Sequence, residues 1–423
     1  MNLPHGLRAF RHRNFRLFFY AQGSKQTGTW LQLIATSWLV HRLSDSAFML
    51  GLSGFALQIP FLALAPFAGV LVDRFDRRRV LAVTNLVSAA QAVALLVLVA
   101  TGRIEVWHLV AGNFVFGVAN TFDAPARQSL LVELVGGRED LPSGIALNSS
   151  MMNGARFIGP MLGGAVIAAF GEVWGFALNS LLSLSLLGAM RVMRLAPRHV
   201  APSHAPWWHQ LRAGIAYAYG FLPTRASLLL LSAVSFSVNP YQSLMPWFAE
   251  KVYAGGSGTL GLLLGAGGLG AVSGMLYLAT RPSIRGLFRL IGAYALIAGA
   301  ALLGFAFCRW LWLGFGLVYL VGMGMMLVAA STNTILQSIV PDEMRGRVAS
   351  LYVMAFLGAS PLGALAGGWV GEHYGPPVTL AAGGALVLAA AMFYTLRLPA
   401  IRREIRPLYE RLGIAPRADQ SLR

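Results

Sequence analysis

The sequence predicts an all-α membrane protein with twelve transmembrane helices in two related six-helix halves. Three observations support this prediction. Of the 423 residues, 56% are hydrophobic and 12% are charged, whereas soluble domains carry about 25% charged residues. The hydrophobic residues gather in long stretches that suit helices of about 20 residues, the length that crosses a bilayer. Similar segments also recur about 205 residues apart, which is close to half the chain.

The expected spans form two groups of six. The first group covers 15–40, 48–72, 79–101, 107–134, 142–170 and 174–195. The second covers 224–249, 257–280, 286–307, 310–338, 347–371 and 377–396. The resulting division is an N-terminal half at 1–195, a cytoplasmic linker at 196–223, a C-terminal half at 224–398 and a basic cytoplasmic tail at 399–423.

Lys and Arg are distributed unevenly between the two sides of the membrane. If the N-terminus lies inside, the inner segments hold 26 of them and the outer loops hold four. Three more fall inside spans: Lys25, Arg127 and Arg156. Basic residues concentrate in cytoplasmic loops, so both termini are expected in the cytoplasm. Because these charges border apolar stretches, the net charge of +17 does not indicate a nucleic-acid partner.

Two segments recur in the same order in both halves. They are 126–135 and 159–171 in the first half, and 331–340 and 362–375 in the second. The Gly163-Gly164 pair precedes Gly367-Gly368 by 204 residues. A chance similarity between glycine-rich helices is the alternative, but the shared order and spacing favour a duplication. Transporters built from related halves bind substrate between the halves, near the membrane midplane.

The loop after the second span reads GVLVDRFDRRR at 69–79. It resembles the G-x-x-x-D-R-x-G-R-R/K signature of the major facilitator superfamily, with Asp76 in place of the second glycine. The resemblance implies an inner gate, in which a carboxylate at the end of a span accepts hydrogen bonds from a helix N-terminus. An ordinary cluster of cytoplasmic arginines would explain Arg77 to Arg79 but not the Asp. The matching residues are Gly69, Asp73, Arg74, Arg77 and Arg78.

The fifth span contains a further motif, formed by Gly159, Pro160, Gly163 and Gly164. It resembles the core of the antiporter motif of drug and siderophore exporters, although small residues also serve helix packing alone. Segments 30–32, 38–40, 125–128, 148–164 and 340–348 look like the enterobactin-exporter, or transmembrane secretion effector, branch. This resemblance implies a monomeric exporter of siderophore-like, drug-like or other amphipathic or anionic compounds in the bacterial inner membrane. It also implies alternating access and protons as the coupling ion.

Charges inside the membrane are costly and therefore mark functional positions. We expect Lys25, Gln22, Gln26, Asn153 and Arg156 to line a substrate cavity. The sequence suggests no acid at the depth of Lys25, so this cavity is expected to be positive and to favour an anionic substrate. The alternative is that Lys25 extends toward the interface or bonds with backbone carbonyls.

Asp123 and Arg127 lie four residues apart near the inner end of the fourth span. Such a pair stabilises a helix by itself. The family resemblance adds a second interpretation, in which Asp123 belongs to the inner gate and pairs with Arg77. Asp123 is the one acid clearly inside an expected span, and it lies near the inner end of that span. The expectation of proton coupling therefore comes from the family resemblance.

Other patterns exclude several classes of chemistry. Residues 265–270 match the dinucleotide fingerprint G-x-G-x-x-G, but they lie in an apolar span without the strand and acid that the motif requires. We interpret them as a helix-packing surface. The eight histidines show no metal-ligand spacing, and the single cysteine excludes an internal disulfide. No cofactor is expected. Two alternatives to a transporter remain: a multi-pass enzyme acting on lipid, and a non-transporting receptor on the same fold. The expected partners of a transporter are its substrate and membrane lipid.

Overall fold

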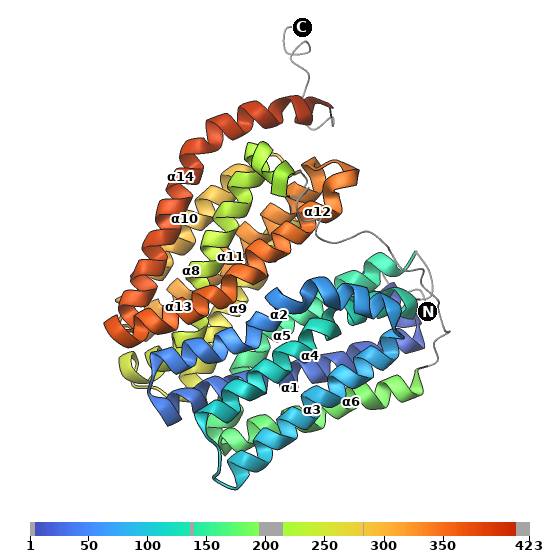
Figure 1. Cartoon of the computed structure of the whole chain (residues 1–423), viewed down its shortest axis with the longest axis vertical. Helices are drawn as coiled ribbons and strands as arrows, with labels where there is room; N and C mark the ends of the chain where they lie inside the picture. The colour runs from blue at the N-terminus through green and yellow to red at the C-terminus, as the bar shows by residue number, and fades with distance from the viewer. Residues whose placement is uncertain (1–4, 136–138, 194–214, 282, 412–423) are drawn as a thin grey trace. The chain divides into compact units, whose positions relative to one another are not determined.

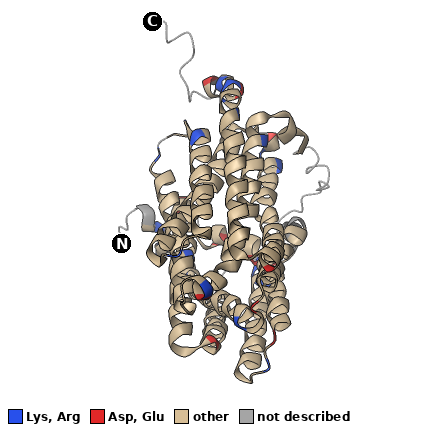
Figure 2. Ribbon diagram, turned by 90° about the vertical axis from the view of Figure 1, so that its left-hand side faces the viewer, with Lys and Arg blue, Asp and Glu red and all other residues tan. Residues whose placement is uncertain are grey.

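A computed structural model describes residues 5–135, 139–193, 215–281 and 283–411. All regular secondary structure in these ranges is helical, which confirms the all-α prediction (Figure 1). Most of the predicted linker falls outside the described residues. Charged residues are sparse along the long helices (Figure 2).

The first six long helices follow a short 3-10 helix, η1 (His5–Arg11). They are α1 (Arg13–Ser44), α2 (Ala47–Arg74), α3 (Arg77–Ala100), α4 (Val106–Leu134), α5 (Leu141–Phe170) and α6 (Glu172–Val192). Each agrees with one expected span to within a few residues. Side-chain caps begin α2, α3 and α4. The Ser46 side chain, for example, accepts a hydrogen bond from the Met49 amide at the start of α2.

The later helices differ more from the expected spans. They are α8 (Leu222–Trp247), α9 (Ser257–Ala279), α10 (Leu287–Ala306), α11 (Leu311–Ile339), α12 (Asp342–Val353), α13 (Ala359–Tyr374) and α14 (Pro376–Arg411). Two π-helical turns, η2 (Phe248–Val252) and η3 (Met354–Gly358), extend α8 and join α12 to α13. The expected eleventh span is thus interrupted by a π turn. The last helix continues into the predicted tail and ends at Arg411 rather than at residue 396.

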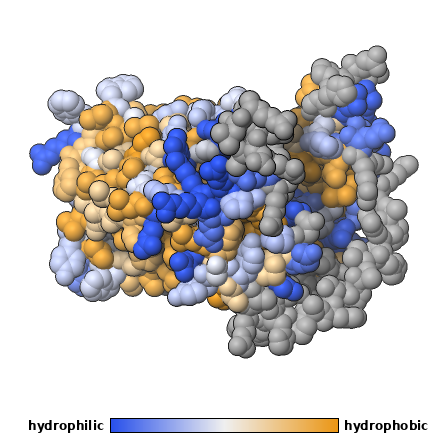
Figure 3. All heavy atoms as spheres, turned by 90° about the horizontal axis from the view of Figure 1, so that it is seen from above, coloured by the Kyte–Doolittle hydropathy of each residue, from blue (hydrophilic) through white to orange (hydrophobic). Residues whose placement is uncertain are grey.

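Eight of the helical segments are long and apolar enough to cross a membrane by length and composition. Large apolar side chains are also exposed on many helices, and Figure 3 shows hydrophobic side chains over much of one face. Exposed tryptophans lie at the starts of α4, α6 and α11, namely Trp107, Trp174, Trp310 and Trp312. Tryptophan prefers the membrane–water interface, so these positions fit the ends of membrane spans.

The chain divides into two compact units. Unit 1 contains Met1–His204 and Gln242–Gly268, and unit 2 contains Ala205–Tyr241 and Leu269–Arg423. Within unit 1, α1 packs against α5 and α6, while α4 contacts α2 and α3 (Figure 1). Within unit 2, α10 contacts α11 and α14. The polar side chains considered next belong mainly to unit 1.

Candidate functional site

A buried cluster of charged residues joins three helices of unit 1. Asp123 on α4 is 3% exposed, and Lys25 on α1 is 6% exposed. Lys25 Nζ lies 2.8 Å from Asp123 Oδ1, and Asn85 Nδ2 on α3 donates to the same oxygen at 3.1 Å. Arg127 Nε lies 3.5 Å from Asp123 Oδ2, one turn further along α4. One carboxylate therefore serves two cations and an amide.

The expectation that Lys25 lacks an acid at its own depth is wrong. Lys25 is the thirteenth residue of α1, and Asp123 is the twelfth residue of α4 counted back from Leu134. Both positions are therefore about 18 Å along the helix from the end that the predicted topology places inside, at 1.5 Å per residue. Since α1 leaves that side and α4 returns to it, the two side chains meet.

The cluster carries an excess of one positive charge, because Lys25 and Arg127 share one carboxylate. Buried ion pairs are retained when their partners are well hydrogen-bonded, and removing one partner leaves an uncompensated buried charge. A proton taken up by Asp123 would have the same electrostatic effect as removing its charge. The charge of Asp123 therefore determines whether Lys25 and Arg127 have a counterion in this cluster.

The other residues expected in the substrate cavity do not join this cluster. Gln22 is 1% exposed, and its Oε1 has no hydrogen-bond partner in the described structure. Gln26 and Asn153 are half-buried, and Asn153 Nδ2 donates to the Ser149 carbonyl at 2.7 Å. The side chain of Arg156 is exposed. Their assignment to a cavity stays a prediction.

A second buried polar network was missed by the sequence analysis. Gln32 Nε2 on α1 donates to Gln91 Oε1 on α3 at 3.0 Å. Asn179 on α6 donates to Gln32 Oε1, and Ser183 Oγ donates to Asn179 Oδ1 at 3.3 Å. Polar residues inside spans were the available signal, because an amide in hydrocarbon needs a partner. The network ties α1, α3 and α6 together in unit 1.

Two arginines of the loop at 69–79, which lie at the start of α3, bind the C-terminal ends of α4 and α6. Arg77 Nη1 lies 2.5 Å from Glu133 Oε1 on α4, so the expected pairing of Arg77 with Asp123 is wrong. Glu133 is ten residues closer than Asp123 to the C-terminal end of α4, which lies near the start of α3 at Arg77. Arg78 Nη2 donates to the Met190 and Met193 carbonyls at 2.9 and 2.7 Å. These are terminal carbonyls of α6, a usual place for a cation.

Other parts of this loop bear on the signature itself. The structure describes the helix backbone at Gly69, Asp73 and Arg74 but not the surroundings of these residues. Asp76, which replaces the usual glycine, is the N-cap of α3. Its side chain accepts a hydrogen bond from the Arg78 amide at 2.8 Å. The departure from the signature thus replaces a flexible turn residue with a helix cap.

The motif of the fifth span is a close-packing surface on two sides. A Cβ atom added at Gly159 would lie 2.5 Å from Trp30 Cγ, and one at Gly163 would lie 3.2 Å from Ile34 Cγ1, both on α1. A Cβ at Gly164 would lie 2.5 Å from the Ser257 carbonyl and 2.8 Å from Gly261 Cα at the start of α9. The approach at Gly164 is to backbone atoms and therefore requires glycine, whereas a side chain at Gly159 or Gly163 would displace Trp30 or Ile34.

The same contact surface explains the glycines at 265–270. A Cβ at Gly268 would lie 2.6 Å from the Arg156 carbonyl, and Gly265 faces Met161. Gly270 faces the backbone of Tyr319 on α11. The interpretation of this stretch as helix packing is confirmed.

Four polar residues meet where α1 ends and where η2 extends α8. His41 is 1% exposed, and its Nε2 lies 2.7 Å from Glu250 Oε2. Lys251 Nζ lies 3.1 Å from Asp45 Oδ2, and this hydrogen bond raises the pKa of Lys251, which therefore stays protonated. No local spacing in the sequence unites His41 with these residues, because Glu250 is more than 200 positions away.

The family model described as "transmembrane secretion effector" matches residues 5–411. The chain is 25% identical to the staphyloferrin A transporter of Staphylococcus aureus, over 83% of this chain and 87% of that protein. It is 27% identical to the multidrug efflux pump Tap of Mycobacterium tuberculosis, over 95% of this chain and 96% of that protein.

Solved structures of low sequence identity show the fold. A bacterial homologue of the human lysosomal transporter Spinster superposes with a TM-score of 0.72 at 13% identity, over 96% of this chain and 99% of that chain. That similarity confirms the predicted major facilitator fold.

Proposed function

Since the chain belongs to the transmembrane secretion effector family of the major facilitator superfamily, we propose that it exports an amphipathic small molecule by alternating access and that Asp123 couples export to protons. Membership in a transporter family excludes the lipid-modifying enzyme that the sequence left open. The names of its relatives favour a siderophore-like or drug-like substrate. The chain is a multi-pass membrane protein, and its bacterial relatives favour the inner membrane.

The observation that supports proton coupling is the shared carboxylate of Asp123. A transporter that exchanges a proton for substrate needs a group whose charge changes inside the membrane and whose partners respond to the change. Asp123 contacts Lys25, Asn85 and Arg127, which come from three helices. When it takes up a proton, Lys25 and Arg127 lose their counterion, and the contacts that join the three helices change.

This mechanism revises the argument for an anionic substrate. Lys25 already has a carboxylate partner, so it does not by itself require a negative charge on the substrate. We propose instead that substrate and proton occupy the cluster in turn: substrate binds while Asp123 is ionised, and protonation of Asp123 changes the contacts of Lys25 and Arg127 and releases the substrate. Binding of one then disfavours binding of the other, which exchange of an incoming proton for an outgoing substrate requires.

The test compares driven and passive movement of two dyes, one anionic and one cationic, in cells that lack their own efflux pumps. We expect Asp123→Asn to abolish export against a gradient and to keep downhill movement, because the coupling charge is fixed as neutral. Glu410→Gln is the matched control, since it removes a carboxylate from the end of α14. Uphill export by a normally expressed Asp123→Asn variant would refute the coupling role.

We also propose that both termini lie in the cytoplasm, from the ratio of 26 inner to four outer basic residues. A reporter enzyme that is active only outside the cytoplasm, fused after Arg423, should then be silent. A strong signal would overturn this orientation. We further propose that the protein is a monomer, and light scattering of the detergent-purified protein would measure its mass. We also propose that the chain divides into halves at 1–195 and 224–398.

A further inference from the structure

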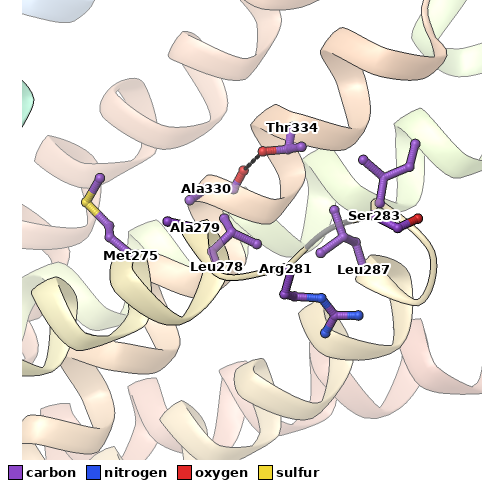
Figure 4. Close-up of a pocket in the computed structure, with 9 residues that line it drawn as sticks. Met275, Leu278, Ala279, Arg281, Ser283, Leu287, Ala330 and Thr334 are labelled. Atoms are coloured by element: carbon purple, nitrogen blue, oxygen red, sulfur yellow. Dashed lines mark hydrogen bonds between the residues drawn. The ribbon is translucent and has the colours of Figure 1, made fainter. Parts of the chain in front are cut away.

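Unit 2 contains a cavity whose lining residues have no role in the proposed transport mechanism. It has a volume of about 390 Å³ and lies where α9 ends, α10 begins and α11 passes alongside (Figure 4). Its lining is mainly apolar, with one cation. The lining residues are Met275, Leu278, Ala279, Arg281, Ser283, Ile284, Leu287, Ala330 and Thr334.

The position of this cavity is at the edge of the membrane. Both α9 and α10 are apolar enough to cross a bilayer, and they end at Ala279 and begin at Leu287. The loop between them therefore lies at the interface. Its arginines, Arg281 and Arg285, place it on the side that the basic residues assign to the cytoplasm. An apolar wall and a cation here face both lipid chains and lipid headgroups.

Arg281 has no acidic partner among the described residues. Its guanidinium donates to the Arg285 carbonyl at 3.0 Å and lies 3.5 Å from the Tyr277 hydroxyl, and both of these are neutral. Two donors on a guanidinium with five N–H groups leave capacity for an anion. In Figure 4 the Arg281 side chain lies below Leu278 and Leu287, and its guanidinium points away from both.

The first half of the chain treats the corresponding loop differently. There Arg77 is neutralised by Glu133 on α4 at 2.5 Å. The recurring segments 126–135 and 331–340 place Ser338 of α11 at the position of Glu133. The second half thus has a basic loop at this point and a serine where the first half has the acid. In the first half an acid of the protein neutralises Arg77, whereas in the second half Arg281 can pair with an anion from outside the protein.

We propose that this cavity binds an anionic phospholipid of the cytoplasmic leaflet, with its phosphate at Arg281 and an acyl chain along Met275, Leu278 and Leu287. Arginine forms bidentate hydrogen bonds with phosphate oxygens, and the apolar wall gives an acyl chain a surface that a free phosphate would not use. Basic pockets at the cytoplasmic ends of membrane helices favour such headgroups.

The experiment measures lipid retention by native mass spectrometry of the full-length protein purified in detergent. Phosphatidylglycerol is titrated against wild type, Arg281→Gln and Ala279→Trp. Arg285→Gln is the matched control, because it removes an exposed arginine of the same loop that does not line the cavity. Phosphatidylcholine and inorganic phosphate are the comparison ligands.

We expect Arg281→Gln to weaken phosphatidylglycerol binding about fivefold, the effect of one basic residue near an anionic headgroup. Ala279→Trp should weaken it by filling the cavity without a change in charge, while Arg285→Gln should bind as the wild type does. Equal retention of phosphatidylcholine, or equal losses in Arg281→Gln and Arg285→Gln, would overturn the proposal. Displacement of the lipid by inorganic phosphate would assign the site to a soluble anion instead.

Discussion

Substitution of Asp123 should destabilise the protein more than substitution of Lys25, although the two form one ion pair. Asp123→Asn leaves both Lys25 and Arg127 without a counterion. Lys25→Met leaves Asp123 with Arg127 at 3.5 Å and Asn85 at 3.1 Å. The asymmetry follows from the three partners of one carboxylate, and a simple isolated pair would not show it.

The magnitudes follow from the geometry. Two charges 2.8 Å apart attract by about 6 kcal/mol at an effective dielectric constant of about 20, and desolvation offsets part of that. Removing the shared acid from this buried cluster should therefore lower the free energy of unfolding by about 3–5 kcal/mol. Losing one charged hydrogen bond in Lys25→Met should lower it by about 1.5–3 kcal/mol.

The assay is denaturant unfolding of the purified protein in detergent for the two single variants and the double variant. The double variant should be more stable than additivity predicts, by about 0.5–3 kcal/mol, because Lys25 no longer faces a neutral side chain. Equal losses in the two single variants, or strict additivity, would refute the shared-carboxylate argument. Export measured on the same samples then separates folding from transport, since a refolded double variant should still fail to couple protons.

Three further predictions concern helix contacts. Glu133→Gln should lower the free energy of unfolding by about 1 kcal/mol by breaking the pair with Arg77. The double variant with Arg77→Gln should lose no further free energy of unfolding. Gly164→Val should cost about 1–3 kcal/mol through overpacking and reduce export, whereas Gly154→Ala, which meets nothing within 4 Å, should not; equal unfolding midpoints would contradict the close approach to α9. Asp73→Asn should lower transport with normal membrane expression, and wild-type export from that variant would leave the loop as a topology signal.

Much of the fold could be predicted because hydrocarbon forces every span to be a long apolar helix. The α1 to α6 boundaries therefore agree with the expected spans. The π turn at Met354–Gly358 and the extension of α14 to Arg411 could not be read from hydropathy. Both depend on packing and on backbone geometry outside the apolar stretches.

The site was harder to predict than the fold. Lys25, Asp123 and Arg127 were each identified as costly charges, but their grouping needed depths measured from the same membrane face. The partner of Arg77 was assigned to the wrong acid on the right helix, because Glu133 and Asp123 are separated by almost three helical turns. Contacts between distant segments, such as His41 with Glu250, leave no local pattern in the sequence.

The division of unit 1 into Met1–His204 and Gln242–Gly268 has a consequence for how the protein is made. The ribosome completes α5 well before it reaches Ser257 and Gly261, which cover the glycine face at Gly164. Since domains fold from the N-terminus as they emerge, the newly inserted first six helices must wait with that face against lipid or the insertion machinery. The N-terminal unit can therefore mature only after about two-thirds of the chain has been synthesised, which ties its assembly to the insertion of α8 and α9.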